Sequence, residues 1–343
     1  MYSTTREPEG DDRTERRLAA ALRAVLPNSA MLKVSVADQP FDGTIRLGSR
    51  RLAVRWIGRG GLREVRDVLR SRPRPDVIVG SEISAAARAA ASEADLGWVD
   101  ETGAAEIVVG NIVVSRSGER RRDSIRPKHW TPSVVGVAEA VLCGVTPTVS
   151  ATAEATGHSM SSTAHALSTL TELGLLEAPA SRGRNSGRRV IDADRLLDEY
   201  ADAATRLRPK AELRCGVLWR EPFAALEKIG DRWDRAGVPW AATGAMAASL
   251  LAPYMTEVTN GEVYVDATSG PELLTIARLA DIEPMGGGRL VVRPFPTATS
   301  ERLATETEGI RIVPWPRVFA DMRQVGVRGE EAAEHLREVV RGR

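Results

Sequence analysis

The sequence predicts a multi-domain α/β protein in which a short helical segment separates two α/β domains. Three observations lead to this prediction. The chain has 343 residues, which is more than one ordinary domain needs. Runs of strand-forming residues alternate with helical periodicity before residue 116 and again after residue 201. Between residues 131 and 191 the pattern changes, and helix caps with apolar spacing predict helices that are followed by two short strands.

The composition is typical of a globular protein with an ample core, with 43% hydrophobic and 27% charged residues. The net charge of +1 gives no overall attraction to nucleic acid, so any such attraction must be local. Two cysteines in separate segments argue against a disulfide framework. No apolar run approaches the ~18 residues of a membrane span, and the polar N-terminus lacks a signal-peptide core. A cytoplasmic protein without membrane contact is therefore expected.

A polar tail, predicted to be disordered, covers residues 1–11, and an α/β domain follows over residues 12–116. The expected elements are a helix at 13–26, strands at 31–37, 43–47 and 51–57, a helix at 62–70, a strand at 76–79, a helix at 85–94, and strands near Trp98, at 105–109 and at 112–115. Residues 117–130 are predicted to be a basic linker, and its central arginines are Arg120, Arg121 and Arg122.

The third predicted domain, residues 131–200, carries the pattern of two helices joined by a tight turn. Thr148 and Ser159 stand where N-caps belong, and Gly157 interrupts the helical pattern between them. Gly174 fits the left-handed position that ends the second helix. Leucines at positions 167, 170 and 173 are expected to face inward. The residues then expected to face outward are Ser161, Ser162, His165, Ser168 and Thr169.

Two short strands around an arginine-rich loop come next, at 175–178 and 189–191. The arginines of this loop and its second strand are Arg182, Arg184, Arg188 and Arg189. The whole segment resembles the winged helix-turn-helix of bacterial regulators of the IclR and MarR kind, whose pattern runs in register over Gly157–Leu175. His165 stands where that family often has arginine. The resemblance implies binding to double-stranded DNA.

The positions of the basic residues predict different DNA contacts for the helix and for the loop. No lysine or arginine occurs from Pro132 to Ala180, so the second helix has no cation with which to neutralise phosphates. The arginines of the loop and the linker are therefore expected to contact phosphates, and the polar face of the helix is expected to contact base edges. The alternatives are a solvated arginine loop and a solvated histidine at position 165.

The C-terminal domain, residues 201–343, is predicted to be mixed α/β. An exit helix at 194–207 leads into it, and the expected elements are helices at 223–236, 244–251, 271–280 and 329–341, and strands at 238–241, 262–266, 289–293 and 310–313. The segments Trp240–Met246 and Gly261–Asp266 resemble the signature of nucleotidyltransferase-like domains. That chemistry requires two carboxylates at positions i and i+2, where they share magnesium. Tyr264 occupies the intervening position, and Glu262 and Asp266 stand roughly 13 Å apart along a strand, so the catalytic pair is missing.

The N-terminal element order is close to that of restriction-endonuclease-like domains, with Asp42 where their first metal-binding aspartate falls. Their chemistry also needs an acid two residues before a lysine on the next strand. The strand at 51–56 has no acid, and none of the four lysines of the chain has a carboxylate two positions before it. Asp42 is therefore predicted to be a turn residue before Gly43. No catalytic residue, metal or cofactor is expected in either outer domain, both of which are interpreted as catalytically degenerate.

Taken together, these three parts resemble the AbiEi family, the antitoxin and transcriptional-regulator components of bacterial type IV toxin–antitoxin systems. The resemblance covers about residues 70–343 and depends on Gly97–Gly110, the helical segment, Trp240–Tyr254, Arg293–Thr297 and Val313–Leu336. It implies a nucleoid-associated regulator that binds promoter DNA.

The outer domains are then expected to be a sensor or an assembly platform. The effector is left open between a nucleotide, a single-stranded nucleic acid and a protein, and a homodimer is also left open. Two other functions remain as alternatives. One is a nucleic-acid-processing enzyme, either a nuclease or a nucleotidyltransferase, and the other is a protein-interaction module that uses the winged helix as a scaffold.

Overall fold

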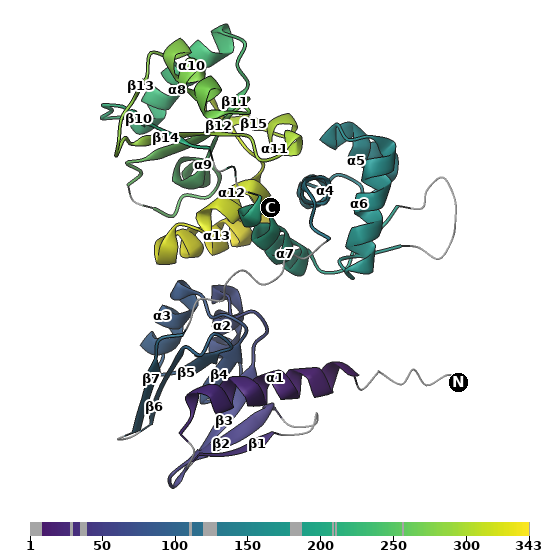
Figure 1. Ribbon diagram of the computed structural model, residues 1–343, viewed down its shortest axis with the longest axis vertical. Helices are drawn as coiled ribbons and strands as arrows, with labels where there is room; N and C mark the ends of the chain where they lie inside the picture. Colours follow the sequence, from purple (N-terminus) through teal and green to yellow (C-terminus); the bar gives the residue numbers. More distant parts are fainter. Residues whose placement is uncertain are drawn as a thin grey trace. The chain divides into compact units, whose positions relative to one another are not determined.

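The computed structural model describes residues 9–27, 30–34, 40–109, 112–118, 129–178, 187–207, 209, 211–255 and 257–342. Over these residues the protein is mixed α/β, with two seven-stranded sheets and one two-stranded sheet (Figure 1). The chain divides into two compact units. Unit 1 contains residues 1–124 and 326–331, and unit 2 contains residues 125–325 and 332–343.

Unit 1 follows the predicted order of elements. These are α1 (Glu9–Val25), β1 (Met31–Val34), β2 (Gly43–Leu47), β3 (Arg50–Trp56), α2 (Leu62–Arg70), β4 (Val77–Gly80), α3 (Ala85–Glu93), β5 (Gly97–Asp100), β6 (Ala105–Val109) and β7 (Ile112–Arg116). The strands lie in the sheet in sequence order. Helices α2 and α3 connect the parallel strands β3, β4 and β5, and the outer pairs are antiparallel.

Apolar residues on both faces of the sheet form two cores in unit 1. Leu18 and Leu22 of α1 pack in one cluster with Val79, whereas Val65 of α2 packs in the other with Ile78. Neighbouring residues of β4 thus point to opposite faces, as strand geometry requires. Helix α1 begins four residues before the predicted start. The prediction used apolar spacing, which indicates only the part of a helix that packs against the core. Its first residues were assigned to the tail, and residues 1–8 lie outside the described residues.

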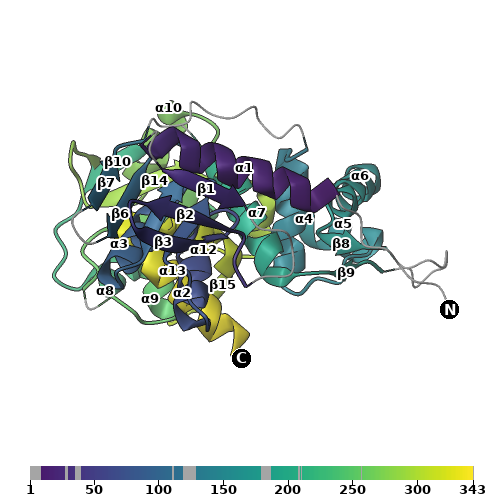
Figure 2. The same cartoon turned by 90° about the horizontal axis from the view of Figure 1, so that it is seen from below.

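The helical segment of unit 2 contains closely packed helices and a short hairpin. Its elements are α4 (Pro132–Leu142), α5 (Val149–Thr156), α6 (Met160–Glu172), β8 (Leu176–Glu177), β9 (Arg189–Val190) and α7 (Ala193–Arg206). Figures 1 and 2 both show α5 and α6 side by side. Val137 of α4, Leu167 and Leu170 of α6, and Leu196 and Tyr200 of α7 are fully buried in one cluster.

The rest of unit 2 is a mixed sheet with helices on both faces. Its elements are β10 (Leu213–Gly216), α8 (Pro222–Arg235), β11 (Trp240–Thr243), α9 (Gly244–Leu251), β12 (Gly261–Val265), α10 (Gly270–Leu279), β13 (Glu283–Pro284), β14 (Leu290–Pro294), α11 (Ala298–Arg302), β15 (Thr305–Thr307), β16 (Ile310–Ile312) and α12 (Trp315–Met322). Helix α13 (Gly326–Arg341) follows, and its residues 326–331 are assigned to unit 1 and the rest to unit 2. The strand order is β13-β10-β14-β12-β11-β16-β15. Helices α8 and α10 cover one face, and α9 and α12 cover the other (Figure 1).

Two features of this sheet differ from the prediction. The strand expected at 238–241 is β11, which begins two residues later, because Pro239 lacks the N–H group that a central strand must donate. The sequence pattern also gave no sign of β10, β13, α11, β15 or α12. Each of these elements has eight residues or fewer, which is too short for periodicity to stand out.

Candidate nucleic-acid interface

The turn between α5 and α6 has the predicted caps at both ends. Thr148 caps α5, and its hydroxyl group accepts a hydrogen bond from the N–H of Ala151 at 3.3 Å. Helix α5 ends at Gly157, which is left-handed with a φ of 72°. Ser159 caps α6 by accepting a hydrogen bond from the N–H of Ser162 at 3.2 Å. Only three residues therefore separate the two helices, as the sequence predicts.

The other end of α6 is also closed as predicted. Gly174 has a φ of 65°, and the N–H of Leu175 donates to the carbonyl of Leu170 at 3.0 Å. This is the hydrogen bond of a glycine-terminated helix, which turns the chain sharply into β8. Both ends of α6 are thereby fixed by local interactions that the sequence encodes.

Most of the α6 side chains that are predicted to face outward lie on its exposed face. Ser161, Ser162 and His165 are exposed in the N-terminal half of the helix, and Ser168 is half-buried. The hydroxyl group of Ser168 donates to the carboxylate of Glu172 at 3.1 Å. The first three side chains thus form one polar surface that is open to solvent.

The prediction that Thr169 also faces outward is wrong. Its side chain is only 4% exposed, and it lies one helical turn from the fully buried Ala166. Its hydroxyl group donates to the carbonyl of His165 at 3.0 Å, so burial leaves this group hydrogen-bonded. The leucine spacing located the centre of the buried stripe but gave no measure of its width.

Two of the predicted arginines have partners, and they are Arg188, just before β9, and Arg189, the first residue of β9. Arg188 is half-buried, and its Nε donates to the hydroxyl of Thr171 on α6 at 3.1 Å. Arg189 forms an exposed ion pair with Glu177 across the β8–β9 hairpin, at 2.6 Å. Arg188 therefore connects the hairpin to α6. The remaining predicted arginines lie outside the described residues, and these are Arg120, Arg121, Arg122, Arg182 and Arg184.

Helix α11, which the sequence did not predict, contacts the end of α5. The guanidinium group of Arg302 donates to the carbonyls of Glu154 and Ala155, at 3.1 and 3.4 Å. Both carbonyls belong to the last turn of α5, where the helix itself offers no donor. A Cβ atom at Gly157 would stand 3.1 Å from the Arg302 side chain, so a glycine at this position also allows the close approach. One arginine of the sheet region thus caps the helix that precedes the turn.

A buried carboxyl group makes a second contact between α11 and the helical segment. Glu139 of α4 is fully buried, and the hydroxyl of Ser300 lies 2.9 and 3.0 Å from its two carboxyl oxygens. Thr297 donates to the same group at 3.4 Å. Burial raises the pKa of Glu139 to about 7, although Arg317 on α12 and these hydrogen bonds oppose the shift. Of the residues that contact Glu139, only Thr297 also has a role that a local sequence pattern can indicate, which is to cap the N-terminus of α11.

Two of the acidic residues considered for catalysis, one in each unit, have structural partners. In unit 1, the carboxylate of Asp42 accepts a hydrogen bond from the N–H of Trp56 at 2.7 Å. In unit 2, Glu262 forms an ion pair with Arg293, and the hydroxyl of the buried Tyr264 donates to Asp321 at 2.9 Å. Within the described residues, no group of three or more His, Cys, Asp or Glu side chains is placed to hold a metal ion.

No protein-family model, curated protein or solved structure matches this chain. A functional assignment therefore depends on the geometry and chemistry of the chain itself. No helix among the described residues combines the length and the apolar character that crossing a membrane requires.

Proposed function

We propose that this protein is a sequence-specific DNA-binding transcriptional regulator, similar to the AbiEi antitoxins, in which residues 131–200 form a winged helix. Helix α6 is the recognition helix, and the β8–β9 hairpin is the wing. The observation that carries the proposal is the open polar surface of Ser161, Ser162 and His165. It lies at the N-terminal half of a helix that follows a capped three-residue turn.

The chemistry of this surface suits the major groove of double-stranded DNA. Serine hydroxyls donate to or accept from base edges, and a histidine N–H donates to the acceptors of guanine. All three side chains are polar and exposed, so their hydrogen-bonding groups are open to such contacts.

Phosphate contacts fall to the arginines around the wing in this proposal. The described part of the helical segment before residue 178 has no lysine or arginine. The hydrogen bond from Arg188 to Thr171 places a cation beside α6, where a phosphate of the same groove would lie. Arg182 and Arg184 of the loop, and Arg120, Arg121 and Arg122 of the linker, are proposed to add further charge.

The two α/β regions are proposed to be a restriction-endonuclease-like domain and a nucleotidyltransferase-like domain that sense or assemble rather than catalyse. Supporting this, the Asp42 carboxylate is hydrogen-bonded to a backbone N–H, and the Glu262 carboxylate is paired with an arginine. The charge of Arg293 offsets the negative charge with which Glu262 would attract a metal ion. An effector that binds either region would alter DNA binding only if it distinguishes two arrangements of the winged helix.

The first test is to select DNA from a random library with the full-length protein and then titrate the selected duplex by fluorescence anisotropy. His165→Ala is expected to reduce the preference for the selected sequence at one base position, at a cost of roughly 1–3 kcal/mol. His335→Ala, on α13, is the matched control and should bind like the wild type. Failure to enrich any sequence would contradict the proposed function. Equal loss of affinity for selected and scrambled DNA would instead show that His165 contacts phosphate.

A further inference from the structure

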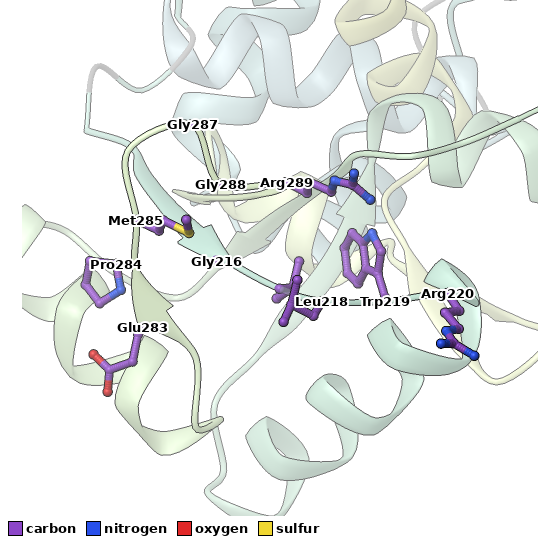
Figure 3. A pocket seen from close by; sticks show the side chains of 11 residues that line it. Gly216, Leu218, Trp219, Arg220, Glu283, Pro284, Met285, Gly287, Gly288 and Arg289 are labelled. Atoms are coloured by element: carbon purple, nitrogen blue, oxygen red, sulfur yellow. The ribbon is translucent and has the colours of Figure 1, made fainter.

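A cavity of about 720 Å³ opens in unit 2 where β10 ends and β13 begins (Figure 3). This volume lies within the range of protein sites that receive a ligand or a partner side chain. The segment after β10 contributes Leu218, Trp219 and Arg220, and the segment from β13 to β14 contributes Glu283, Met285 and Arg289. None of these residues belongs to the proposed DNA-binding surface.

The middle of this surface is apolar and open to water. Leu218 is fully exposed, at 108% of its reference area, and Met285 is 60% exposed. Trp219 is 8% exposed and is held in place by a hydrogen bond from its indole N–H to the carbonyl of Thr259 at 3.0 Å. A Cβ atom at Gly216 would stand 2.7 Å from the Met285 sulfur, so glycine permits Met285 to lie against the backbone of β10. Large exposed apolar side chains around a hollow are typical of a surface that another molecule covers.

The charges of this surface are separated between its two ends. Figure 3 shows Glu283 at one end of this surface and Arg220 at the other, with Leu218 and Trp219 between them. Arg289 lies beside Trp219, in the half of the surface away from Glu283. All three charged side chains are exposed. Across the described residues, none of the three forms an ion pair or a side-chain hydrogen bond. The acid thus lies at one end of the surface and both bases lie in the opposite half, with apolar side chains between the acid and Arg220.

We propose that this surface is a two-fold interface that binds a second copy of the same chain. A two-fold axis brings the same patch of two copies together in opposite directions. The acidic end of one copy then faces the two arginines of the other, which forms the same set of ion pairs twice. The fully exposed Leu218 of each copy enters the cavity of the other beside Trp219. A patch with one sign of charge would not match itself in this way.

The contact uses side chains rather than the addition of a strand to the sheet. Strand β13 is at the edge of the sheet, but it has only two residues, and one of them is Pro284, which lacks an N–H group. Such an edge offers little backbone for pairing. The interface therefore depends on Leu218 and on the charges at the two ends.

The oligomeric state of the full-length protein tests this proposal by light scattering after size exclusion, at micromolar concentrations. The wild type is expected to be a dimer, and Leu218→Asp a monomer. Ile191→Asp is the matched control because Ile191 is also an exposed apolar residue, at 54%, but lies outside this surface. It should remain dimeric. A monomeric wild type overturns the proposal, as does a Leu218→Asp variant that is still a dimer.

A charge exchange tests the two-fold geometry itself. Glu283→Arg makes both ends of the surface basic, and Arg220→Glu combined with Arg289→Glu makes both ends acidic. Each variant alone is expected to be monomeric because like charges then face each other. An equimolar mixture of the two, with different affinity tags, is expected to form a heterodimer. A mixture without heterodimer, or variants that dimerise alone as the wild type does, overturns the proposal. The result is independent of DNA binding, which the anisotropy titration reports separately.

Discussion

At the scale of single residues, Arg188 has two roles that can be separated. Its Nε donates to Thr171 and so holds the hairpin to α6, and its charge is proposed to neutralise a phosphate. Arg188→Ala is expected to weaken binding to all DNA sequences and to lower the slope of log K against log salt by about 1. Thr171→Val removes only the hydroxyl group that anchors Arg188. It should weaken binding without changing the salt slope.

Anisotropy titrations over a series of salt concentrations measure both variants. If Arg188→Ala has the salt slope of the wild type, Arg188 only anchors the hairpin and does not contact a phosphate. The sequence predicted this arginine as a DNA contact but not its hydrogen bond, because Arg188 and Thr171 come together only when the hairpin folds back on α6.

The buried Glu139 gives the protein a dependence on pH. Its pKa is raised from the ordinary value of 4.5 to about 7, first by burial. Between these two values the folded protein holds a proton that the unfolded chain has released. The contribution of Glu139 to the free energy of unfolding is therefore fully present below pH 4.5 and is lost as the pH rises through 7. The corresponding change in the free energy of unfolding is about 3 kcal/mol.

Glu139→Gln keeps the shape of the side chain and removes its titration. Urea unfolding of the wild type and the variant at pH 5 and pH 8 isolates this group from the other titrating residues. From pH 5 to pH 8 the free energy of unfolding of the variant is expected to rise by about 2.5 kcal/mol relative to that of the wild type. The same pH dependence in both proteins would show that Glu139 is not protonated in the folded state.

At the scale of elements, local interactions explain why the turn between α5 and α6 could be predicted. Thr148, Gly157 and Ser159 act on their own helices, so their residue types alone indicate helix ends. The contacts of α11 differ in kind. Glu139 meets Ser300, and α5 meets Arg302, across a large separation in sequence. Neither hydrophobic periodicity nor a helix cap predicts such a pairing, because it forms only when the sheet region packs against the helices.

Arg302 is expected to stabilise α5 from outside the helical segment. A cation at the last turn of a helix interacts favourably with the helix dipole and binds its free carbonyls. Arg302→Ala should therefore destabilise the helical segment by about 1 kcal/mol and increase hydrogen exchange in the last turn of α5. Arg302→Lys keeps the charge and should recover part of this loss. DNA affinity is expected to fall with Arg302→Ala while the salt slope stays unchanged, since Arg302 is not a proposed phosphate contact. A lower salt slope would place Arg302 on the DNA.

At the scale of the whole molecule, each unit has cores of its own. Unit 1 holds two apolar clusters on the two faces of its sheet, and the single large cluster of unit 2 contains residues of both the helical segment and the second sheet. The order of elements in unit 1 could be predicted from local patterns along the chain, and its strands then lie in the sheet in that same order. In the second sheet, neighbouring strands come from distant parts of the chain, and no local pattern indicates such pairing. The helical segment and the second sheet were predicted as separate domains, yet they share one core.

Deletion of residues 1–116 is therefore expected to leave DNA binding intact. The chain that remains keeps every residue of the large apolar cluster of unit 2, together with the contacts of Glu139 and Arg302. Affinity for the selected duplex should stay close to that of the full-length protein, whereas any response to an effector bound by unit 1 should disappear. Circular dichroism shows whether the shortened protein is folded, and anisotropy measures its affinity. If a folded variant no longer binds the duplex, unit 1 is itself part of the surface that contacts DNA.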